Sequence, residues 1–377
     1  MSDPRSASLT IYPRLAAIQA ALRPAGVDLL ALAVTNNLRY TLSGFAPTAD
    51  ERFCALLIGP DQVAFVVPEL NAAQVRASVN LPLYSYDDAV GPQGALDAAL
   101  LSVDAGRARA ALADEQMWAD QLLTLQEALP AARFGRAGLV ISPLRSRKDS
   151  TEIEALLSVA DTADAGVEAV LAAIAHGMSE RELAAVASEA MRRVGAETVE
   201  FATVASGPHT AMPHHHSDER LLERGDVVLI DIGSSMDGYC SDITRMAIVG
   251  GAEPDPDYKK VHNLVEDALR AAIAAARVGV PAHAVDDAAR GVVAAAGYGE
   301  YFVHRTGHGL GRSGHEPPYL TASSDTILES GMVFSIEPGI YLPGRFGVRL
   351  EEVVHLDSAG AHVFSGLPRA VHVSGSY

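Results

Sequence analysis

The C-terminal half of the chain contains five side chains whose types suit the binding of divalent metal ions: Asp231, Asp242, His308, Glu337 and Glu351. Hard cations such as Mn²⁺ and Mg²⁺ prefer oxygen ligands, and a single imidazole shifts the preference toward Mn²⁺, Co²⁺ or Zn²⁺. Two such ions about 3.5–4 Å apart can activate a water molecule and polarise a carbonyl group. The five residues therefore predict a site for two divalent ions, with Mn²⁺ favoured and Co²⁺ or Zn²⁺ as alternatives, and hydrolytic chemistry.

The segments that contain these acids show an internal repeat. Residues 225–233 and 331–339 share the pattern G-x-V-x-x-I-acid-x-G, in which the acid is Asp231 or Glu337. Each segment is followed about a dozen residues later by a second acid, Asp242 or Glu351, on an expected strand that also contains an arginine. We interpret the repeat as two related strand pairs about a pseudo-twofold axis, each of which donates two carboxylates.

Two histidine-containing segments accompany the acids. His308 lies between glycines, which would let the backbone approach an ion closely. The stretch Gly309–Gly314 matches G-x-G-x-x-G, but prolines follow at 317 and 318 and preclude the helix that a dinucleotide site needs. In Pro213-His214-His215-His216, strand alternation allows at most two histidines to face one way. His214 is our candidate for a functional imidazole, with the next two histidines at the rim.

The elements that must position these residues fall into two predicted domains. Residues 1–142 alternate short apolar strands (28–34, 53–58 and 63–67) with helices (15–22, 87–101 and 116–129), which predicts a small α/β domain. The polar connector 143–149 is the predicted boundary. Residues 143–377 are predicted to form an α+β domain. Its first two helices open with the capping boxes Asp149/Glu152 and Ser179/Glu182, its later helices span 258–276 and 284–296, and its strands span 227–232, 238–249, 332–336 and 348–356.

Composition narrows the classes of protein and partner. The 377 residues carry a net charge of −18, which argues against nucleic acid or an anionic membrane surface as a partner. Two cysteines exclude a disulfide framework and suit a reducing compartment. The first 18 residues lack the apolar core of a signal peptide, and no apolar stretch is long enough for a membrane-spanning helix. We expect a cytoplasmic protein.

Six segments together resemble the signature of the pita-bread metallopeptidases: Pro213-His214, Leu229–Gly233, Cys240–Arg245, Thr306–Gly311, Ser335–Gly339 and Val348–Glu352. The domain before them resembles the creatinase-type N-terminal domain, which favours the prolidase (Xaa-Pro dipeptidase) and aminopeptidase P branch. The resemblance implies a creatinase-type α/β domain followed by an α+β pita-bread catalytic domain with pseudo-twofold symmetry. It also implies short proline-containing peptides as substrates and a homodimer.

The resemblance assigns a role to each ligand. Asp231 would bind one ion, Asp242 and Glu351 would bridge the two ions, and His308 and Glu337 would complete the second site. Glu337 would also carry a proton from the attacking water to the leaving nitrogen.

The resemblance extends to residues around the ligands. His315 would hydrogen-bond the scissile carbonyl, His214 would contact the substrate on the other side, and Arg349 is expected to support the carboxylates and to take part in substrate binding.

One position departs from the prolidase pattern. Prolidases carry an arginine four residues after the position of His315, where it binds the carboxylate of a dipeptide, and this chain has Tyr319 there. Arg52 is a hypothesis for the missing cation, against the alternative of a solvated loop arginine.

From the resemblance as a whole we predict an Xaa-Pro dipeptidase, with aminopeptidase P acting on longer peptides as the alternative. Another amide hydrolase on this fold, or a non-catalytic binding module, fits less well because all five ligands are present.

Overall fold

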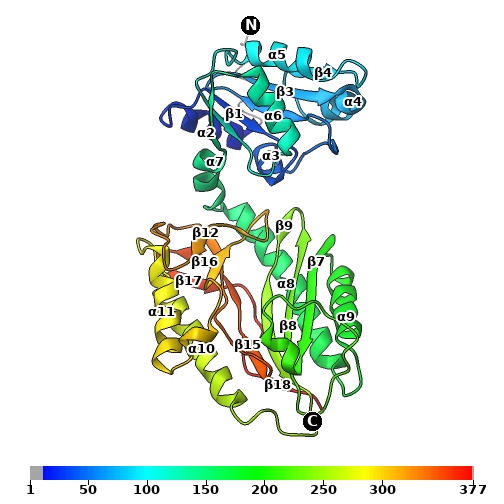
Figure 1. Ribbon diagram of the computed structural model, residues 1–377, viewed down its shortest axis with the longest axis vertical. Coiled ribbons are helices and arrows are strands. Elements are labelled where there is room, and N and C mark those ends of the chain that lie inside the picture. Colours follow the sequence, from blue (N-terminus) through cyan, green and yellow to red (C-terminus); the bar gives the residue numbers. More distant parts are fainter. Residues whose placement is uncertain (1–11, 376–377) are drawn as a thin grey trace. The chain divides into compact units, whose positions relative to one another are not determined.

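The computed structural model describes residues 12–375, which form two compact units that divide between Arg145 and Ser146 (Figure 1). The division falls within the predicted connector 143–149, three residues after the limit at 142/143 that separates the two predicted domains. Gly138–Arg145 forms helix α7, with Pro143 inside it, and α7 buries Val140 and Ile141 in the first unit. Residues 1–11, which bear on the expected absence of a signal peptide, lie outside the described part. No helix within residues 12–375 is long and apolar enough to cross a bilayer.

The first unit is built on a six-stranded mixed sheet with the order β4-β3-β2-β1-β5-β6. β1 runs parallel to β5 and antiparallel to β2, so the sheet is mixed at its centre. Its strands are β1 (Leu29–Leu32), β2 (Ala55–Ile58), β3 (Val63–Pro68), β4 (Leu83–Tyr86), β5 (Ala110–Ala113) and β6 (Arg133–Arg136). Its helices are α2 (Pro13–Leu22), α3 (Asn36–Thr41), α4 (Glu69–Ser78), α5 (Gln93–Ser102), α6 (Ala119–Ala128) and α7.

Both faces of this sheet are buried, which explains why its strands are apolar throughout rather than alternating. Leu30 and Leu32 face a core shared with α2, α4 and α7. Leu29 and Ala31 face the opposite core, which α5 and α6 cover. The first unit is thus a three-layer α/β/α domain, as the sequence predicts.

The second unit contains four long helices and two main sheets. The helices are α8 (Ser150–Ala173), α9 (Glu180–Arg193), α10 (Tyr258–Ala275) and α11 (Ala282–Ala295), with two 3₁₀ turns, η1 (Gly207–Ala211) and η2 (Gly299–Tyr301). Both predicted capping boxes are confirmed at the starts of α8 and α9. The strands are β7 (Thr198–Ser206), β8 (Val227–Met236), β9 (Tyr239–Cys240), β10 (Ile243–Ile248), β11 (Gly307–Gly309), β12 (Glu316–Leu320), β13 (Val333–Ile336), β14 (Gly339–Leu342), β15 (Phe346–Arg349), β16 (Glu352–Asp357), β17 (Gly360–Val363) and β18 (His372–Val373).

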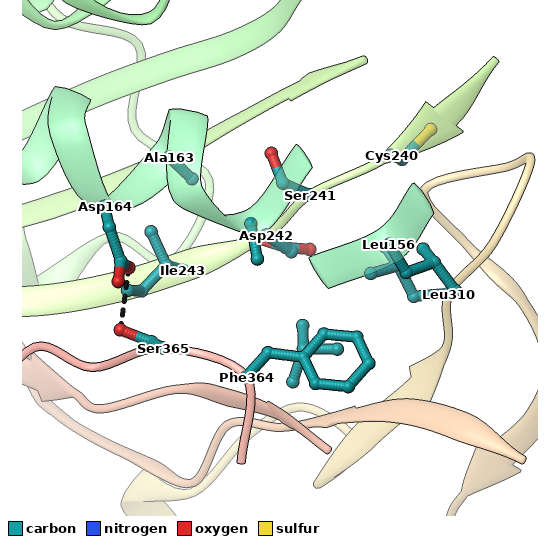
Figure 2. Close-up of a pocket in the computed structure, with 12 residues that line it drawn as sticks. Leu156, Ala163, Asp164, Cys240, Ser241, Asp242, Ile243, Leu310, Phe364 and Ser365 are labelled. Atoms are coloured by element: carbon teal, nitrogen blue, oxygen red, sulfur yellow. Dashed lines mark hydrogen bonds between the residues drawn. The ribbon is translucent and has the colours of Figure 1, made fainter. Parts of the chain in front are cut away.

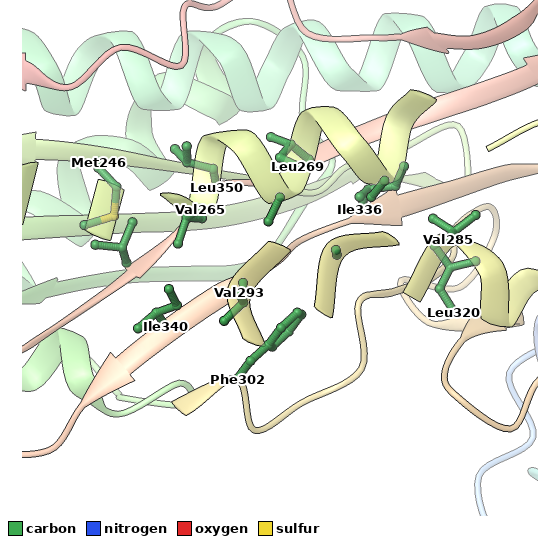
Figure 3. Packing of buried hydrophobic residues seen from close by; sticks show 14 of the residues in the cluster. Met246, Val265, Leu269, Val285, Val293, Phe302, Leu320, Ile336, Ile340 and Leu350 are labelled. Carbon is green, nitrogen blue, oxygen red and sulfur yellow. The ribbon is translucent and has the colours of Figure 1, made fainter. Parts of the chain in front are cut away.

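The second unit has two halves of similar design. Helices α8 and α9 pack on the sheet β18-β10-β8-β7, and α10 and α11 pack on the sheet β12-β11-β13-β16-β17 and the hairpin β14-β15 (Figure 1). In the second core, Val265 and Leu269 of α10 and Val293 of α11 meet Ile336 and Ile340 of the strands (Figure 3). The paired arrangement agrees with the internal repeat seen in the sequence.

A buried arginine ties the two halves together. Arg245 on β10 is 2% exposed, and its guanidinium donates to the carbonyl oxygen of Glu351 at 2.7 Å and to the carboxylate of Glu352 on β16 at 2.9 Å. Arg369 also donates to the Glu352 carboxylate, at 2.7 Å. Since Arg245 lies three positions after one candidate ligand and contacts the backbone of another, this ion pair fixes the distance between the halves where the ligands converge.

We predict that Arg245→Met lowers the free energy of unfolding by about 3–5 kcal/mol, because it removes one of the two arginines that pair with the buried Glu352 carboxylate and the donor to the Glu351 carbonyl. The matched control is Arg270→Met, which breaks an exposed ion pair with Asp267 and should cost less than about 1 kcal/mol. Urea unfolding measures both variants. Equal losses for the two would contradict the structural role of Arg245.

Candidate metal centre

All five candidate ligands line one cavity of about 430 Å³ in the second unit. The cavity is also lined by His214, His315 and Arg349, which the sequence analysis singled out, and by His304 and Arg305. Residues separated by 120 positions in the chain, Asp231 and Glu351, therefore meet at one place.

The backbone positions of the ligands differ in part from the expectation that they lie on strands. Asp231 lies within β8 and His308 within β11. Asp242 lies in the gap between β9 and β10, and Glu351 lies in the gap between β15 and β16, whereas both were expected within strands. Glu337 directly follows β13, in agreement with the predicted strand 332–336. A regular strand points alternate side chains to opposite faces, whereas an interruption frees a side chain from that alternation. The three breaks thus let carboxylates from different strands point to one centre.

The ligand atoms are close enough to share ions. Asp231, Asp242 and Glu351 each offer an oxygen within 4.8 Å of the others, and His308, Glu337 and Glu351 form a second such group. His308 Nε2 lies 3.4 Å from Glu337 Oε1 and 3.7 Å from Asp242 Oδ2. Glu351 belongs to both groups, which fits the bridging role that the resemblance implies for it.

His308 is held in the neutral form that a metal ligand requires. Burial, followed by repulsion from His315, lowers the pKa of His308 to about 3. Its Nδ1 lies 3.1 Å from the carbonyl oxygen of Gly309, to which the ring N–H donates. The lone pair of Nε2 is then directed at the carboxylates, as in other histidines oriented by an outer hydrogen bond.

The carboxylates repel one another in a buried space. Desolvation, and then the charges of Asp231 and Glu337, raise the pKa of Asp242 well above its usual range. Desolvation and the charge of Asp242 do the same to Glu351. Burial raises the pKa of Glu337 to about 7. The cluster therefore carries its full negative charge only when positive charge is supplied.

A buried oxygen of Asp231, unpaired in the described part of the chain, also fits the binding of divalent ions. Asp231 Oδ2 accepts a hydrogen bond of 2.5 Å from Arg349, but its buried Oδ1 has no hydrogen-bond partner within residues 12–375. A buried acceptor without a partner costs about 1–3 kcal/mol. An oxygen-binding cation next to Oδ1 would remove that cost, so this atom and the donor set together fit two hard divalent ions.

Arg349 and Thr244 support the carboxylates. The three nitrogens of Arg349 donate to Asp231, to Thr244 Oγ1 at 3.2 Å and to Tyr341 Oη at 2.8 Å. Thr244 in turn donates to Glu351 Oε2 at 2.8 Å. The expected supporting role of Arg349 agrees with these contacts, while its assignment to substrate binding stays a prediction, since each of its nitrogens already has a protein acceptor.

The glycines beside His308 serve the sheet rather than the ion. A Cβ at Gly307 would lie 1.9 Å from the carbonyl oxygen of Ser335, and one at Gly309 would lie 2.3 Å from that of Pro317. Glycine is thus required for β11 to fit between its neighbours, which differs from the predicted reason. The prolines at 317 and 318 lie in strand β12, so the segment lacks the helix of a dinucleotide site, as predicted.

The other predicted site residues are found in different surroundings. His214 lines the cavity, and the His315 ring lies 3.8 Å from the His308 ring, between centroids. Tyr319 is 38% exposed on β12 and is not among the residues that line the cavity. Arg52 belongs to the first unit, where its guanidinium pairs with Asp88 at 3.0 Å.

Cys240, two residues before the candidate ligand Asp242 in sequence, is a buried packing residue. Its side chain borders a small cavity of about 10 Å³ with Leu156 and Leu310, next to Asp242 (Figure 2). That volume is at the lower limit of what holds a single water molecule, so the cavity is too small for a substrate. Because Cys240 is buried, its thiol packs as a small apolar group rather than acting as a reactive one.

The loop that carries His214 is anchored by Glu180, a residue that the sequence analysis missed. Glu180 is fully buried, and its carboxylate accepts from the N–H and hydroxyl of Ser206 at 2.7 Å. It also contacts His209 Nδ1 at 3.0 Å and His215 Nε2 at 2.6 Å. His215 was expected at the rim. It lines the cavity, and the contact with Glu180 holds its imidazole ring in place. The only sequence signal was that Glu180 directly follows the cap Ser179.

The chain matches two protein-family models and resembles solved structures along most of its length. Residues 154–358 match the model of metallopeptidase family M24, and residues 14–147 match that of the creatinase/prolidase N-terminal domain. The structure is similar to dipeptidase PepE from Mycobacterium ulcerans, with a TM-score of 0.90, 37% identity and coverage of 97% of this chain and 98% of that one.

Two further relatives differ in the reaction that their names state. An Xaa-Pro dipeptidase from Pyrococcus furiosus is 31% identical over 348 residues, which are 89% of this chain and 92% of the relative. The X-Pro aminopeptidase from Thermotoga maritima has a TM-score of 0.80 at 30% identity and covers 94% of this chain and 98% of that one.

We predict that Mn²⁺ raises the melting temperature of the metal-free protein. At a concentration one hundred times the Kd, binding adds about 2.7 kcal/mol, which corresponds to a rise of about 5–10 °C for a domain of this size. Glu351→Gln should remove most of the rise, because Glu351 belongs to both ligand groups. The exposed control Glu300→Gln should keep it. A full rise in Glu351→Gln would contradict the site, and calorimetry of the transition measures each case.

We predict that Glu180→Gln lowers the free energy of unfolding by about 1–3 kcal/mol, since an amide cannot accept from all the donors around the carboxylate. Glu189→Gln on the exposed face of the same helix is the control. Urea unfolding measures both, and an unchanged stability in Glu180→Gln would show that the loop has another anchor.

Proposed function

Because the chain belongs to metallopeptidase family M24 and carries a creatinase/prolidase N-terminal domain, we propose that it hydrolyses the Xaa-Pro bond of dipeptides. Family membership makes the chain a metallopeptidase and confirms the predicted fold, a creatinase-type α/β domain followed by a pita-bread catalytic domain. The intact ligand set argues against a non-catalytic binding module.

The observation that carries the proposal is the convergence of Asp231, Asp242, His308, Glu337 and Glu351 on one cavity, with the partnerless oxygen of Asp231 at its wall. Two divalent ions held by these residues would polarise the scissile carbonyl and increase the acidity of water. Mn²⁺ is the ion that we favour, and its identity stays a prediction, as do the homodimer and the cytoplasmic location.

The side chains of the protein provide the proton transfers and the orientation. In the proposed reaction, Glu337 takes a proton from the attacking water and gives it to the proline nitrogen as the C–N bond breaks. The second proton of the water leaves with the new carboxylic acid, so the products are a free amino acid and proline.

His315 is suited to stabilise the carbonyl oxygen. Its Nδ1 lies 2.9 Å from Arg305 Nη2 and accepts from it, since a guanidinium has no acceptor. A neutral His315 then carries its proton on Nε2, which can donate to the oxygen as negative charge develops there. His214, across the same cavity, is proposed to contact the substrate from the other side.

The dipeptide preference rests on relatives of stated activity, which include the Xaa-Pro dipeptidase from Pyrococcus furiosus and a prolidase from Thermococcus sibiricus. Aminopeptidase P is the second candidate, and the observation that favours it is Tyr319, which stands where prolidases carry an arginine. The two activities differ in whether the substrate continues beyond proline.

We predict that the Mn²⁺-loaded protein cleaves Ala-Pro faster than Ala-Pro-Ala, because a free carboxylate after proline should add binding energy. Release of alanine measures both rates. Faster cleavage of the tripeptide would replace the dipeptidase with the aminopeptidase, and cleavage of neither would overturn Xaa-Pro hydrolysis.

A second measurement tests the mechanism. His315→Ala should lower kcat about 10²–10³-fold, the usual cost of losing a donor to a developing oxyanion. Metal content, measured by mass spectrometry, should be unchanged in this variant. A loss of metal together with activity would make His315 a ligand instead.

A further inference from the structure

The charge balance of the catalytic cavity leaves one cation without an acidic partner. Arg305 and Arg349 are the two arginines among the residues that line the cavity. Arg349 is 4% exposed and donates to Asp231, so its charge is committed to the carboxylate cluster. The direct contacts of the Arg305 side chain in the described part of the chain are a hydrogen bond to His315 and a stack on an aromatic ring, so its charge acts on Glu337 only from beyond ion-pair distance.

The ring under Arg305 is that of Tyr319. The guanidinium carbon lies 4.7 Å from the ring centroid, which is the geometry of a cation–π contact. Such a stack fixes the plane of the guanidinium and leaves N–H donors at its edge available. A planar, fixed guanidinium is the group best suited to bind a carboxylate through two parallel hydrogen bonds.

The position of Arg305 matches the place of a substrate carboxylate. His315, which faces the scissile carbonyl in the proposed reaction, accepts from Arg305 Nη2 at 2.9 Å. In a dipeptide the terminal carboxylate is only a few bonds from that carbonyl, on the leaving-group side. A donor adjacent to His315 can therefore reach the carboxylate of a dipeptide, whereas a longer peptide would place a neutral amide there.

We propose that Arg305, held flat on Tyr319, binds the C-terminal carboxylate of an Xaa-Pro dipeptide and makes the enzyme selective for dipeptides. The inference rests on the proposed Xaa-Pro hydrolysis. It gives Tyr319 a purpose, because the tyrosine ring supports the guanidinium of a residue in the segment that precedes β11. It also removes the need for Arg52, whose charge Asp88 already neutralises.

The test compares Ala-Pro with Ala-Pro-NH₂ on the Mn²⁺-loaded protein, since the two substrates differ only in the terminal charge. Arg305→Gln should lower the ratio of kcat/KM for Ala-Pro to that for the amide by about 10–100-fold, the size expected for a lost pair of charge-assisted hydrogen bonds. Arg305→Lys, which keeps the charge without the fork, should give an intermediate ratio, and Tyr319→Ala should lower the ratio more than Tyr319→Phe. Because the ratio is used, a loss of activity through His315 or through misfolding cancels.

The matched control is Arg312→Gln. Arg312 also stacks on a tyrosine, with its guanidinium carbon 4.6 Å from the ring centroid of Tyr239, but it does not line the cavity. The ratio should be unchanged in this variant. An unchanged ratio in Arg305→Gln, or an equal fall in Arg312→Gln, would overturn the proposal.

A binding measurement separates this inference from the proposed reaction. Calorimetric titration of the metal-loaded protein with L-proline and with prolinamide needs no turnover. The wild-type protein should prefer proline, and Arg305→Gln should lose that preference. If the protein cleaves no Xaa-Pro substrate but keeps an Arg305-dependent preference for proline, the proposed reaction fails while the carboxylate site stands. A wild-type protein without the preference overturns the carboxylate site.

Discussion

The mutual repulsion of four clustered carboxylates, one buried and three partly buried, is the constraint on which the catalytic unit depends. Two unit charges 4 Å apart interact by about 4 kcal/mol at an effective dielectric constant of about 20, and several such pairs meet in this cavity. Fixed positive charges and hydrogen-bond donors of the protein reduce this repulsion. Arg349 and Thr244 bind the acids directly, and Arg245 holds the backbone on which Glu351 sits. The remaining charge makes the cavity a strong attractor for divalent cations.

Much of the site could be predicted from the sequence because its ligands lie in a repeated pattern. The acids at 231 and 337 follow apolar runs in which a bare carboxylate has no structural use, so a functional role could be predicted for them from the sequence alone. The strand end before Glu337 was predicted, but the interruptions at 242 and 351 were not, since residue alternation continues through a break without a change of composition. The polar connector 143–149 located the boundary, but not that helix α7 continues into it as far as Arg145.

Contacts between distant segments could not be predicted at all. Glu180 begins a helix and looks like any first-turn acid, yet it is buried under the histidine loop. Arg305 and Tyr319 lie fourteen positions apart, and only the pairing of β11 with β12 brings their segments together. Local propensity and spacing describe elements, whereas these contacts depend on how the elements pack. The residues that tune substrate choice therefore came from the structure, and the ligands came from the sequence.

The division of the ligands between two halves has a consequence for the order of folding. Each half alone offers two carboxylates, and an isolated pair on a partly folded chain is a weak and unselective trap for metal. The complete set forms only when segments more than a hundred residues apart have docked, which is a late event for contacts of such long range. The complete metal centre thus requires both halves to be docked, so a chain in which they have not docked lacks the full ligand set of the peptidase.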